Sequence, residues 1–155
     1  MDSTPNGLNI TKILFTNSIP SNEELFKACI EIRRKVFVIG QNVSEERDLD
    51  GLDQDSIHYL LLDGNYPVGT ARVRIVDEKA KIERVAIIQE KSKKGFGTFL
   101  MTHILEDIKS NYKSKVAELG SQLYISKFYK KFGFVEEGEV FLDANIDHIY
   151  MKKIL

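Results

Sequence analysis

The chain has 155 residues, 43% of them hydrophobic, with nine Phe and six Tyr, which is enough to build the core of one ordinary domain. Its 22 basic and 23 acidic side chains give a formal net charge of -1, which argues against whole-molecule attraction to nucleic acid or to an anionic membrane. The lone cysteine, Cys29, excludes an intramolecular disulfide and is expected to be a small buried side chain.

The start of the chain does not have the pattern of a targeting segment. Residues 1–9 are polar and include Pro5, and no apolar run reaches the roughly 18 residues of a membrane span. We expect a single domain over residues 1–155, flexible at residues 1–9 and located in the reducing cytoplasm.

A strand and then a helix are predicted at residues 10–16 and 21–38. Ser21 and Glu24 have the spacing of a capping box, in which each side chain accepts from a backbone amide at the helix start. Apolar residues recur at helical spacing along the helix: Leu25, Phe26, Cys29, Ile32, Val36 and Phe37. Arg33 lies off this stripe.

The polar, acidic segment at residues 40–56 raises the question of calcium, because it contains four closely spaced aspartates: Asp48, Asp50, Asp53 and Asp55. Gly51 comes too early for an EF-hand loop, however, and Tyr59 stands where the bidentate Glu belongs. We therefore expect no metal, and prefer a lid that pairs with arginines or attracts a cationic amine.

Two strands at residues 57–62 and 68–76 are predicted to form a hairpin through the turn at residues 64–67. Side chains alternate between the faces of a strand. Arg72 and Arg74 should therefore point the same way.

A third strand at residues 81–88 leads through a Lys/Gly loop into a helix at residues 97–109. Gly95 and Gly97 allow the backbone to come close to a ligand, while amides at the helix start and the neighbouring lysines supply positive charge. These features predict a phosphate site.

The last part of the chain reads as a strand at residues 116–122, a short helix at 124–132 and a hairpin of strands at 135–142 and 146–152. Tyr129 lies on the short helix, before a Phe-Gly-Phe turn. It also belongs to an apolar stripe that could simply be core: Ile125, Phe128, Tyr129 and Phe132.

The loop and the short helix together resemble the GCN5-related N-acetyltransferase (GNAT) superfamily, whose loop reads Gln/Arg-x-x-Gly-x-Gly/Ala and whose later helix ends Phe-Tyr-x-x-x-Gly-Phe. Other segments resemble its small bacterial ElaA-like subgroup: IRRKVFVIGQN, DLDGLD, TARVR, IERVAI, LGSQ and NIDHIYM. The resemblance implies an α/β fold with a mixed central sheet and helices on both faces. Three residues depart from the family pattern: Ser92 for Arg or Gln, Gly40 for Glu, and Gln122 for Asn.

The resemblance also implies acetyl-coenzyme A as co-substrate. In such a fold the backbone of Val85 and Ile87 holds the pantetheine, and amides of the glycine loop hold the pyrophosphate. The expected cofactor contacts are Val85, Ala86, Ile87, Lys93, Lys94, Gly95, Phe96, Gly97, Thr98, Gln122 and Phe128. Tyr129 matches the general acid that protonates the departing thiolate.

The need for a base depends on the acceptor amine. Near pH 7 an α-amino-type group with a pKa of ~8 is about a tenth neutral, against roughly one part in 2,500 for a lysine near ~10.4, a gap of about 3 kcal/mol. A low-pKa amine could therefore use a carboxylate acting through water. Glu83, beside the pantetheine strand, is the first candidate and Glu139 the second, although either could be an ordinary surface residue.

The arginines suggest the class of acceptor, because all six precede Val85. Guanidinium suits carboxylate or phosphate, so a small anionic amine is expected, with glucosamine 6-phosphate as the best single guess. The expected acceptor contacts are Arg33, Arg72, Arg74 and His148. Some of the arginines could instead pair with the acidic segment.

Two alternatives remain open. The acceptor could be a protein lysine or N-terminal amine received by the acidic segment, or the chain could be a non-catalytic acyl-coenzyme A binding module, as Ser92 and Gly40 suggest. The histidines have no zinc-ligand spacing. A homodimer is also expected, because many relatives pair through edge strands.

Overall fold

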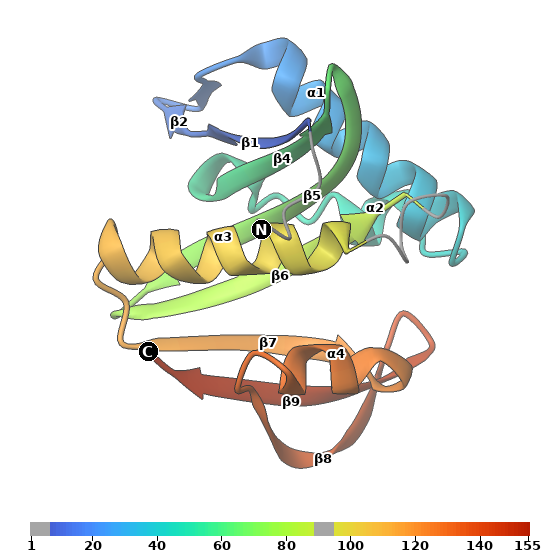
Figure 1. The fold of residues 1–155 in the computed structure, drawn as a ribbon. Helices are drawn as coiled ribbons and strands as arrows, with labels where there is room; N and C mark the ends of the chain where they lie inside the picture. The colour runs from blue at the N-terminus through green and yellow to red at the C-terminus, as the bar shows by residue number, and fades with distance from the viewer. Residues whose placement is uncertain (1–6, 89–94) are drawn as a thin grey trace.

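The computed structural model describes residues 7–88 and 95–155, which form a large mixed sheet with helices on both faces (Figure 1). The fold class predicted from the sequence is confirmed. The strand order is β1-β4-β5-β6-β7-β9-β8, and in the described part of the sheet every neighbouring pair is antiparallel except β6–β7. The strands are β1 (Leu8–Ile13), β4 (Ile57–Asp63), β5 (Tyr66–Val76), β6 (Lys79–Ile87), β7 (Val116–Gln122), β8 (Val135–Asp143) and β9 (Ile146–Ile154).

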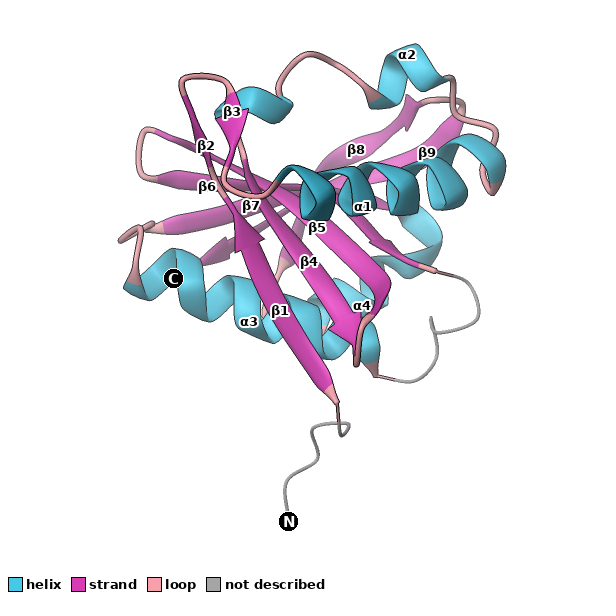
Figure 2. Ribbon diagram, turned by 90° about the horizontal axis from the view of Figure 1, so that it is seen from above, coloured by secondary structure: helices cyan, strands magenta, loops and turns pink. Residues whose placement is uncertain are grey.

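Helix α1 lies on one face of the sheet, and α3 and α4 lie on the other (Figure 2). The helical segments are α1 (Glu23–Arg33), its π-helical continuation η1 (Arg34–Ile39), α2 (Glu45–Asp48), η2 (Asp53–Asp55), α3 (Phe96–Ser110), η4 (Leu123–Ile125) and α4 (Ser126–Lys130). No helix among the described residues is long and apolar enough to cross a membrane.

Each face of the sheet has its own core. Leu100 and Ile104 of α3 are fully buried on one face, and Cys29 of α1 packs with Leu60 on the other. Burial raises the pKa of the Cys29 thiol to about 11, so the thiol stays neutral. The expectation of a small buried cysteine is confirmed.

The N-terminal segment departs from the prediction. β1 begins at Leu8, which pairs with Asp63, and it ends at Ile13 rather than at residue 16. Residues 8 and 9, expected to be flexible, therefore belong to the sheet, while residues 1–6 lie outside the described part. A small hairpin that was not predicted follows, made of β2 (Phe15–Thr16) and β3 (Ile19–Pro20).

Helix α1 begins one residue later than the capping box predicts. Asn22 is the N-cap, and its Oδ1 accepts a hydrogen bond from the Leu25 amide at 3.0 Å. Ser21 instead accepts one from the Leu14 amide through Oγ, also at 3.0 Å. Ser21 therefore holds the preceding turn rather than the helix.

The other predicted elements are present with small shifts. The β4–β5 and β8–β9 hairpins and helix α3 are confirmed, and β7 has its predicted bounds. The helix predicted at residues 124–132 is shorter, because it starts with the 3-10 turn η4. The acidic segment, predicted as a polar stretch, contains the short helices α2 and η2.

Candidate active site

An opening between β6 and β7 is the central feature of the site. The parallel ladder between them ends at the pair Lys81 and Glu118, after which the two strands separate (Figure 1). A cavity of about 440 Å³ lies there, lined by residues 82–87 and 119–122, and we call it the β6–β7 cavity. Its volume is typical of a small-molecule site.

A β-bulge shapes the β6 wall of this cavity. The register against β5 shifts, so that Arg84 and Val85 together oppose Ala71 alone. Arg84 has a left-handed backbone with φ 55°, which is strained for a residue with a Cβ. A bulge leaves its extra residue out of the ladder, which frees backbone groups for a ligand. Val85, Ala86 and Ile87, the predicted pantetheine contacts, all line the cavity.

The N-terminus of α3 meets the same cavity. Gly95 is its N-cap with φ 78°, a conformation that favours glycine. A Cβ on Gly97 would lie 3.3 Å from the Phe128 ring, so glycine allows the helix start to lie close to α4. First-turn amides have no acceptor within their own helix, so those of Gly97 and Thr98 suit an anion. Phe96 is buried in the core. The other two predicted contacts of this loop, Lys93 and Lys94, lie outside the described residues.

Tyr129 of α4 lines the cavity and is 5% exposed. Its ring packs edge-on against Phe128 and Phe134, at centroid distances of 5.1 and 6.1 Å. Burial, and to a lesser extent the nearby Tyr124, raises the pKa of the Tyr129 phenol, which is therefore protonated at neutral pH. It is both a core residue and a hydrogen-bond donor in the cavity wall.

Gln41, Gln122 and His148 form the wall opposite Tyr129's helix. The two glutamines exchange hydrogen bonds: Nε2 of Gln122 donates to Oε1 of Gln41 at 2.8 Å, and the reverse bond is 3.2 Å. His148 pairs with Gln122 across β7 and β9, and its Nδ1 lies 2.7 Å from the carbonyl oxygen of Ile146. These side chains give the cavity a polar side.

Charged side chains gather on the other flank of β6, between the sheet and the acidic segment. They form a network that we call the ion-pair cluster: Arg33, Arg72, Arg74, Arg84, Asp48, Asp50, Asp53 and Glu83. The acidic segment is thereby tied to β5 and β6, as the sequence suggested.

Arg33 is buried in this cluster, with 1% exposure, rather than lying outside the core. Its Nη1 donates to Asp53 at 2.7 Å, its Nε to Asp48 at 3.3 Å, and its Nη2 to the Asp48 carbonyl oxygen at 2.8 Å. The expectation that Arg33 binds the acceptor is not supported, because its donors are used within the protein.

Arg72 is also fully buried and makes a two-point contact with Asp50, with both N···O distances 2.8 Å. This contact lowers the pKa of Asp50 well below its ordinary range. Arg74 is partly exposed and makes a two-point contact with Glu83, at 2.7 and 3.0 Å. The predicted shared face of the two arginines is confirmed, but both serve carboxylates of the chain.

Glu83 is a poor base in this setting. Burial alone would raise its pKa, but the hydrogen bond from Arg74 and the charge of Arg72 outweigh burial and lower it. A carboxylate held by two guanidinium groups resists taking a proton. Glu139, the second candidate base, is exposed on β8 and does not line the cavity.

The remaining candidates are placed as follows. His58 is buried beside the ion-pair cluster, with Nε2 2.9 Å from the Asp53 carbonyl oxygen, and His103 is exposed on α3. Within residues 7–88 and 95–155, no group of three or more His, Cys, Asp or Glu could hold a metal ion.

Comparisons with known proteins agree with this geometry. The sequence profile of the acetyltransferase (GNAT) domain matches residues 23–155. The chain belongs to the GNAT family. The uncharacterized N-acetyltransferase YjcF of Bacillus subtilis is 36% identical over 136 residues, covering 87% of this chain and 96% of YjcF.

Similarity to ElaA of Escherichia coli supports the predicted subgroup. ElaA is 32% identical over 130 residues, covering 81% of this chain and 85% of ElaA. Its crystal structure superposes with a TM-score of 0.82, at 26% identity, over 94% of this chain and 99% of ElaA. A Bacillus subtilis acetyltransferase in complex with CoA shares the fold, with a TM-score of 0.68 and 18% identity over 96% of this chain and 99% of that one. This GNAT chain is an acetyl-CoA-dependent N-acetyltransferase of the ElaA-like subgroup.

Sequence reasoning missed three parts of the GNAT site. Gln41 lies in a quoted motif but was given no role, and the exposed ring of Tyr124 at the cavity was not considered. No glycine or proline in the sequence of β6 marks the bulge at Arg84.

Proposed function

We propose that this protein transfers the acetyl group of acetyl-CoA to a small primary amine inside the β6–β7 cavity. The observation that carries the proposal is the break in the β6–β7 ladder, with the α3 N-terminus at the cavity and Tyr129 in its wall. Backbone groups of Val85 and Ile87 would hold the pantetheine arm. Amides of Gly97 and Thr98, with Lys93 and Lys94, would face the diphosphate.

The reaction needs few reactive side chains. The amine nitrogen attacks the thioester carbonyl carbon, the carbon–nitrogen bond forms, and the carbon–sulfur bond breaks with its electron pair on sulfur. Backbone amides at the bulge would face the developing oxyanion, and preorganised amides need no reorganisation at that moment. Tyr129 would donate its hydroxyl hydrogen toward the sulfur. Burial raises the pKa of the phenol, so its hydroxyl keeps its hydrogen at neutral pH and is available as a donor.

The class of acceptor proposed is broader than the small anionic amine that the arginines suggested. Glucosamine 6-phosphate loses its main support, because Arg33 and Arg72 are occupied by carboxylates. Arg74 is the more exposed of the predicted anion contacts, but it holds Glu83. We therefore propose a small primary amine, and keep the amino-sugar phosphate as one acceptor to be tested. A homodimer and a cytoplasmic location stay predictions.

The test combines calorimetry with a turnover screen. The purified chain is titrated with CoA, then assayed with acetyl-CoA and amino-sugar phosphates, amino acids, polyamines and lysine peptides. In Tyr129→Phe, kcat should fall about 100-fold with the KM for acetyl-CoA little changed, as expected for loss of a proton donor. Tyr66→Phe, at an exposed tyrosine outside the cavity, is the control. CoA binding without turnover of any amine would favour the binding module, and turnover of peptides alone would favour a protein acceptor.

A further inference from the structure

A second, smaller cavity of about 80 Å³ adjoins the β6–β7 cavity. We call it the annex. It lies between η1, α2 and the β8–β9 turn, with Val43 and Ile146 in its walls. The two cavities share five residues, which stand where they meet: Phe37, Gln41, Arg84, Gln122 and His148.

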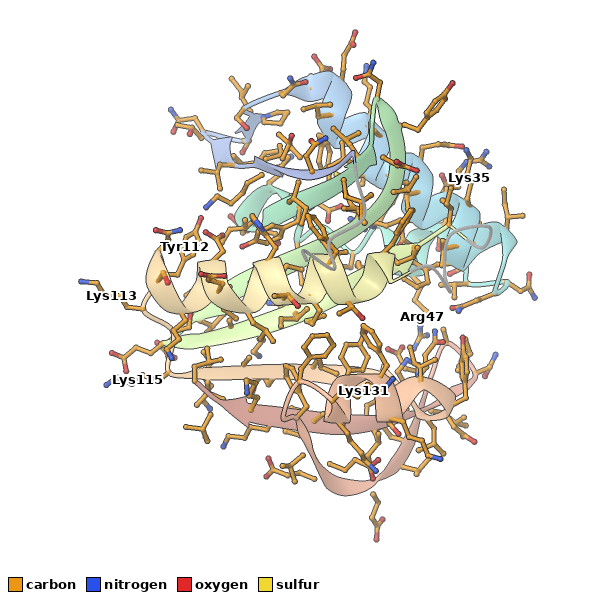
Figure 3. All side chains as sticks on the ribbon, viewed as in Figure 1. Lys35, Arg47, Tyr112, Lys113, Lys115 and Lys131 are labelled. Atoms are coloured by element: carbon orange, nitrogen blue, oxygen red, sulfur yellow. The ribbon has the colours of Figure 1, made fainter. Side chains whose placement is uncertain are left out.

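Arg47 bounds the annex on its outer side, where α2 approaches the β8–β9 turn (Figure 3). Its guanidinium donates to Asp143 at 2.9 Å, and both side chains are more than half exposed. An ion pair as exposed as this one contributes little to stability and exchanges readily with solvent. The annex can therefore admit a ligand from this side.

His148 is held in one tautomer at the junction. Nδ1 lies 2.7 Å from the Ile146 carbonyl oxygen, which can only accept, so Nδ1 carries a hydrogen and, in the neutral ring, the lone pair is on Nε2. The ring stacks on Phe141 at a centroid distance of 5.8 Å and an angle of 28°, which fixes its plane. No described residue donates to Nε2.

The charged groups around His148 are already neutralised by each other. Arg47 pairs with Asp143, and Nε of Arg84 lies 3.3 Å from Asp48. Gln41, which follows η1, and Gln122 of β7 bond to each other. β8 contributes Phe141, and on β9 itself Tyr150 is bonded to Glu118. Among the described residues that line the two cavities, His148 Nε2 is thus the one basic atom without a partner.

We propose that the acceptor amine reaches the thioester through the annex and gives its proton to Nε2 of His148. The inference rests on the proposed N-acetyltransferase function. As the carbon–nitrogen bond forms, the nitrogen–hydrogen bond breaks toward Nε2 and the carbon–sulfur electron pair goes to the sulfur. The imidazolium then returns its proton to solvent, and solvent replaces the hydrogen that Tyr129 gives to the sulfur. His148, rather than Glu83, is the catalytic base.

The size of the annex selects the kind of amine. At about 80 Å³ the annex is far narrower than the β6–β7 cavity of about 440 Å³. An aminomethyl group on an unbranched chain fits this space, whereas an amine on a sugar ring carbon would bring the ring with it. Unbranched alkylamines should therefore be better acceptors than glucosamine.

The test compares His148→Gln with His103→Gln, the same change at an exposed histidine outside both cavities. With 1,3-diaminopropane as acceptor, kcat/KM of His148→Gln at pH 7 should fall about 100-fold. The acidic limb of log kcat/KM against pH should lose one unit of slope, while the calorimetric Kd for acetyl-CoA stays within about two-fold. Added imidazole should partly restore turnover in His148→Ala, and His103→Gln should behave as wild type.

The outcomes separate the two proposals. A wild-type protein that binds acetyl-CoA but acetylates no amine would refute the proposed function, and this inference with it. Turnover by the wild type with an unchanged rate and pH profile in His148→Gln would refute only the role of His148. Preference for glucosamine over the diamine would refute entry through the annex. Circular dichroism and melting of His148→Gln and His148→Ala show whether a loss of rate reflects misfolding.

Discussion

The two flanks of β6 use one strand in opposite ways. Glu83 and Arg84, which also border the β6–β7 cavity, join the ion-pair cluster toward β5 and the acidic segment, where each charge meets an opposite charge. Toward β7 the backbone ladder stops at Lys81, and a cavity opens. On the first flank the charged side chains are paired with one another. On the second flank unpaired backbone groups of β6 can hydrogen-bond to a ligand.

This contrast shows that gathered charge is a weak guide to a ligand site. The arginines suggested anion binding from the sequence, yet Arg33 and Arg72 are buried against carboxylates of the same chain. Capacity for a ligand lies instead where backbone pairing is interrupted. Variants in the ion-pair cluster and variants at the cavity test the two flanks separately.

The largest loss of stability is expected from removing Arg72 from the ion-pair cluster. Arg72→Met removes the buried cation shared by Asp50, Asp53 and Glu83, and the free energy of unfolding should fall by about 3 kcal/mol. The loss stays at the low end for a broken buried pair because Arg84, Arg33 and Arg74 still face these partly exposed carboxylates. Urea unfolding measures it. Arg34→Met removes a surface pair with Glu31 and should change stability little. A stable Arg72→Met with a raised acceptor KM would make the cluster part of the acceptor site.

The open flank is tested at the start of α3. Gly97→Asp adds a Cβ that meets Phe128 and a negative charge where a diphosphate is expected, so the calorimetric Kd for CoA should rise about 100-fold, or about 2.8 kcal/mol. Thr102→Asp, which adds the same charge at an exposed position later in α3, is the control. Unchanged affinity in Gly97→Asp would place the diphosphate elsewhere.

A smaller effect on stability is expected from His58, which is buried beside the ion-pair cluster. Burial lowers the pKa of His58 below its ordinary 6.5 in the folded state, so between that folded pKa and pH 6.5 the unfolded chain binds more protons. Stability from this residue is complete above pH 6.5 and falls as the pH drops, by up to about 1.4 kcal/mol per pH unit.

The check is urea unfolding between pH 5 and 7. His58→Gln should lose the slope found in the wild type, and a retained slope would assign it to another group. The pKa values of Asp50, Asp53 and Glu83 in the cluster are lowered, so these carboxylates stay ionised over this pH range and do not contribute to the slope.

Local patterns predicted most of the fold. Alternating side chains and turn residues located the β4–β5 hairpin, and β7 was predicted with its observed bounds. The glycine loop and the Tyr129 helix likewise indicated the sides of the cavity, because both are continuous segments. The cap was misplaced by one residue because Ser21 and Asn22 are both good N-cap residues.

The remaining misses depend on residues far apart in the chain. Helical periodicity places Arg33 outside the core, and its burial follows from Asp48 and Asp53, 15 and 20 positions later, which no local pattern records. The bulge at Arg84 depends on how β6 sits against β5.

The short ladder between β6 and β7 has a mechanical consequence. Three residue pairs form the whole described seam between the two halves of the sheet. A pantetheine arm that hydrogen-bonds to the unpaired parts of both β6 and β7 would connect the two halves of the sheet. Bound acetyl-CoA would therefore reduce the motion of strands that it does not contact. Amides of β9 should then exchange with deuterium more slowly in the presence of acetyl-CoA, although β9 is separated from β6 by β7.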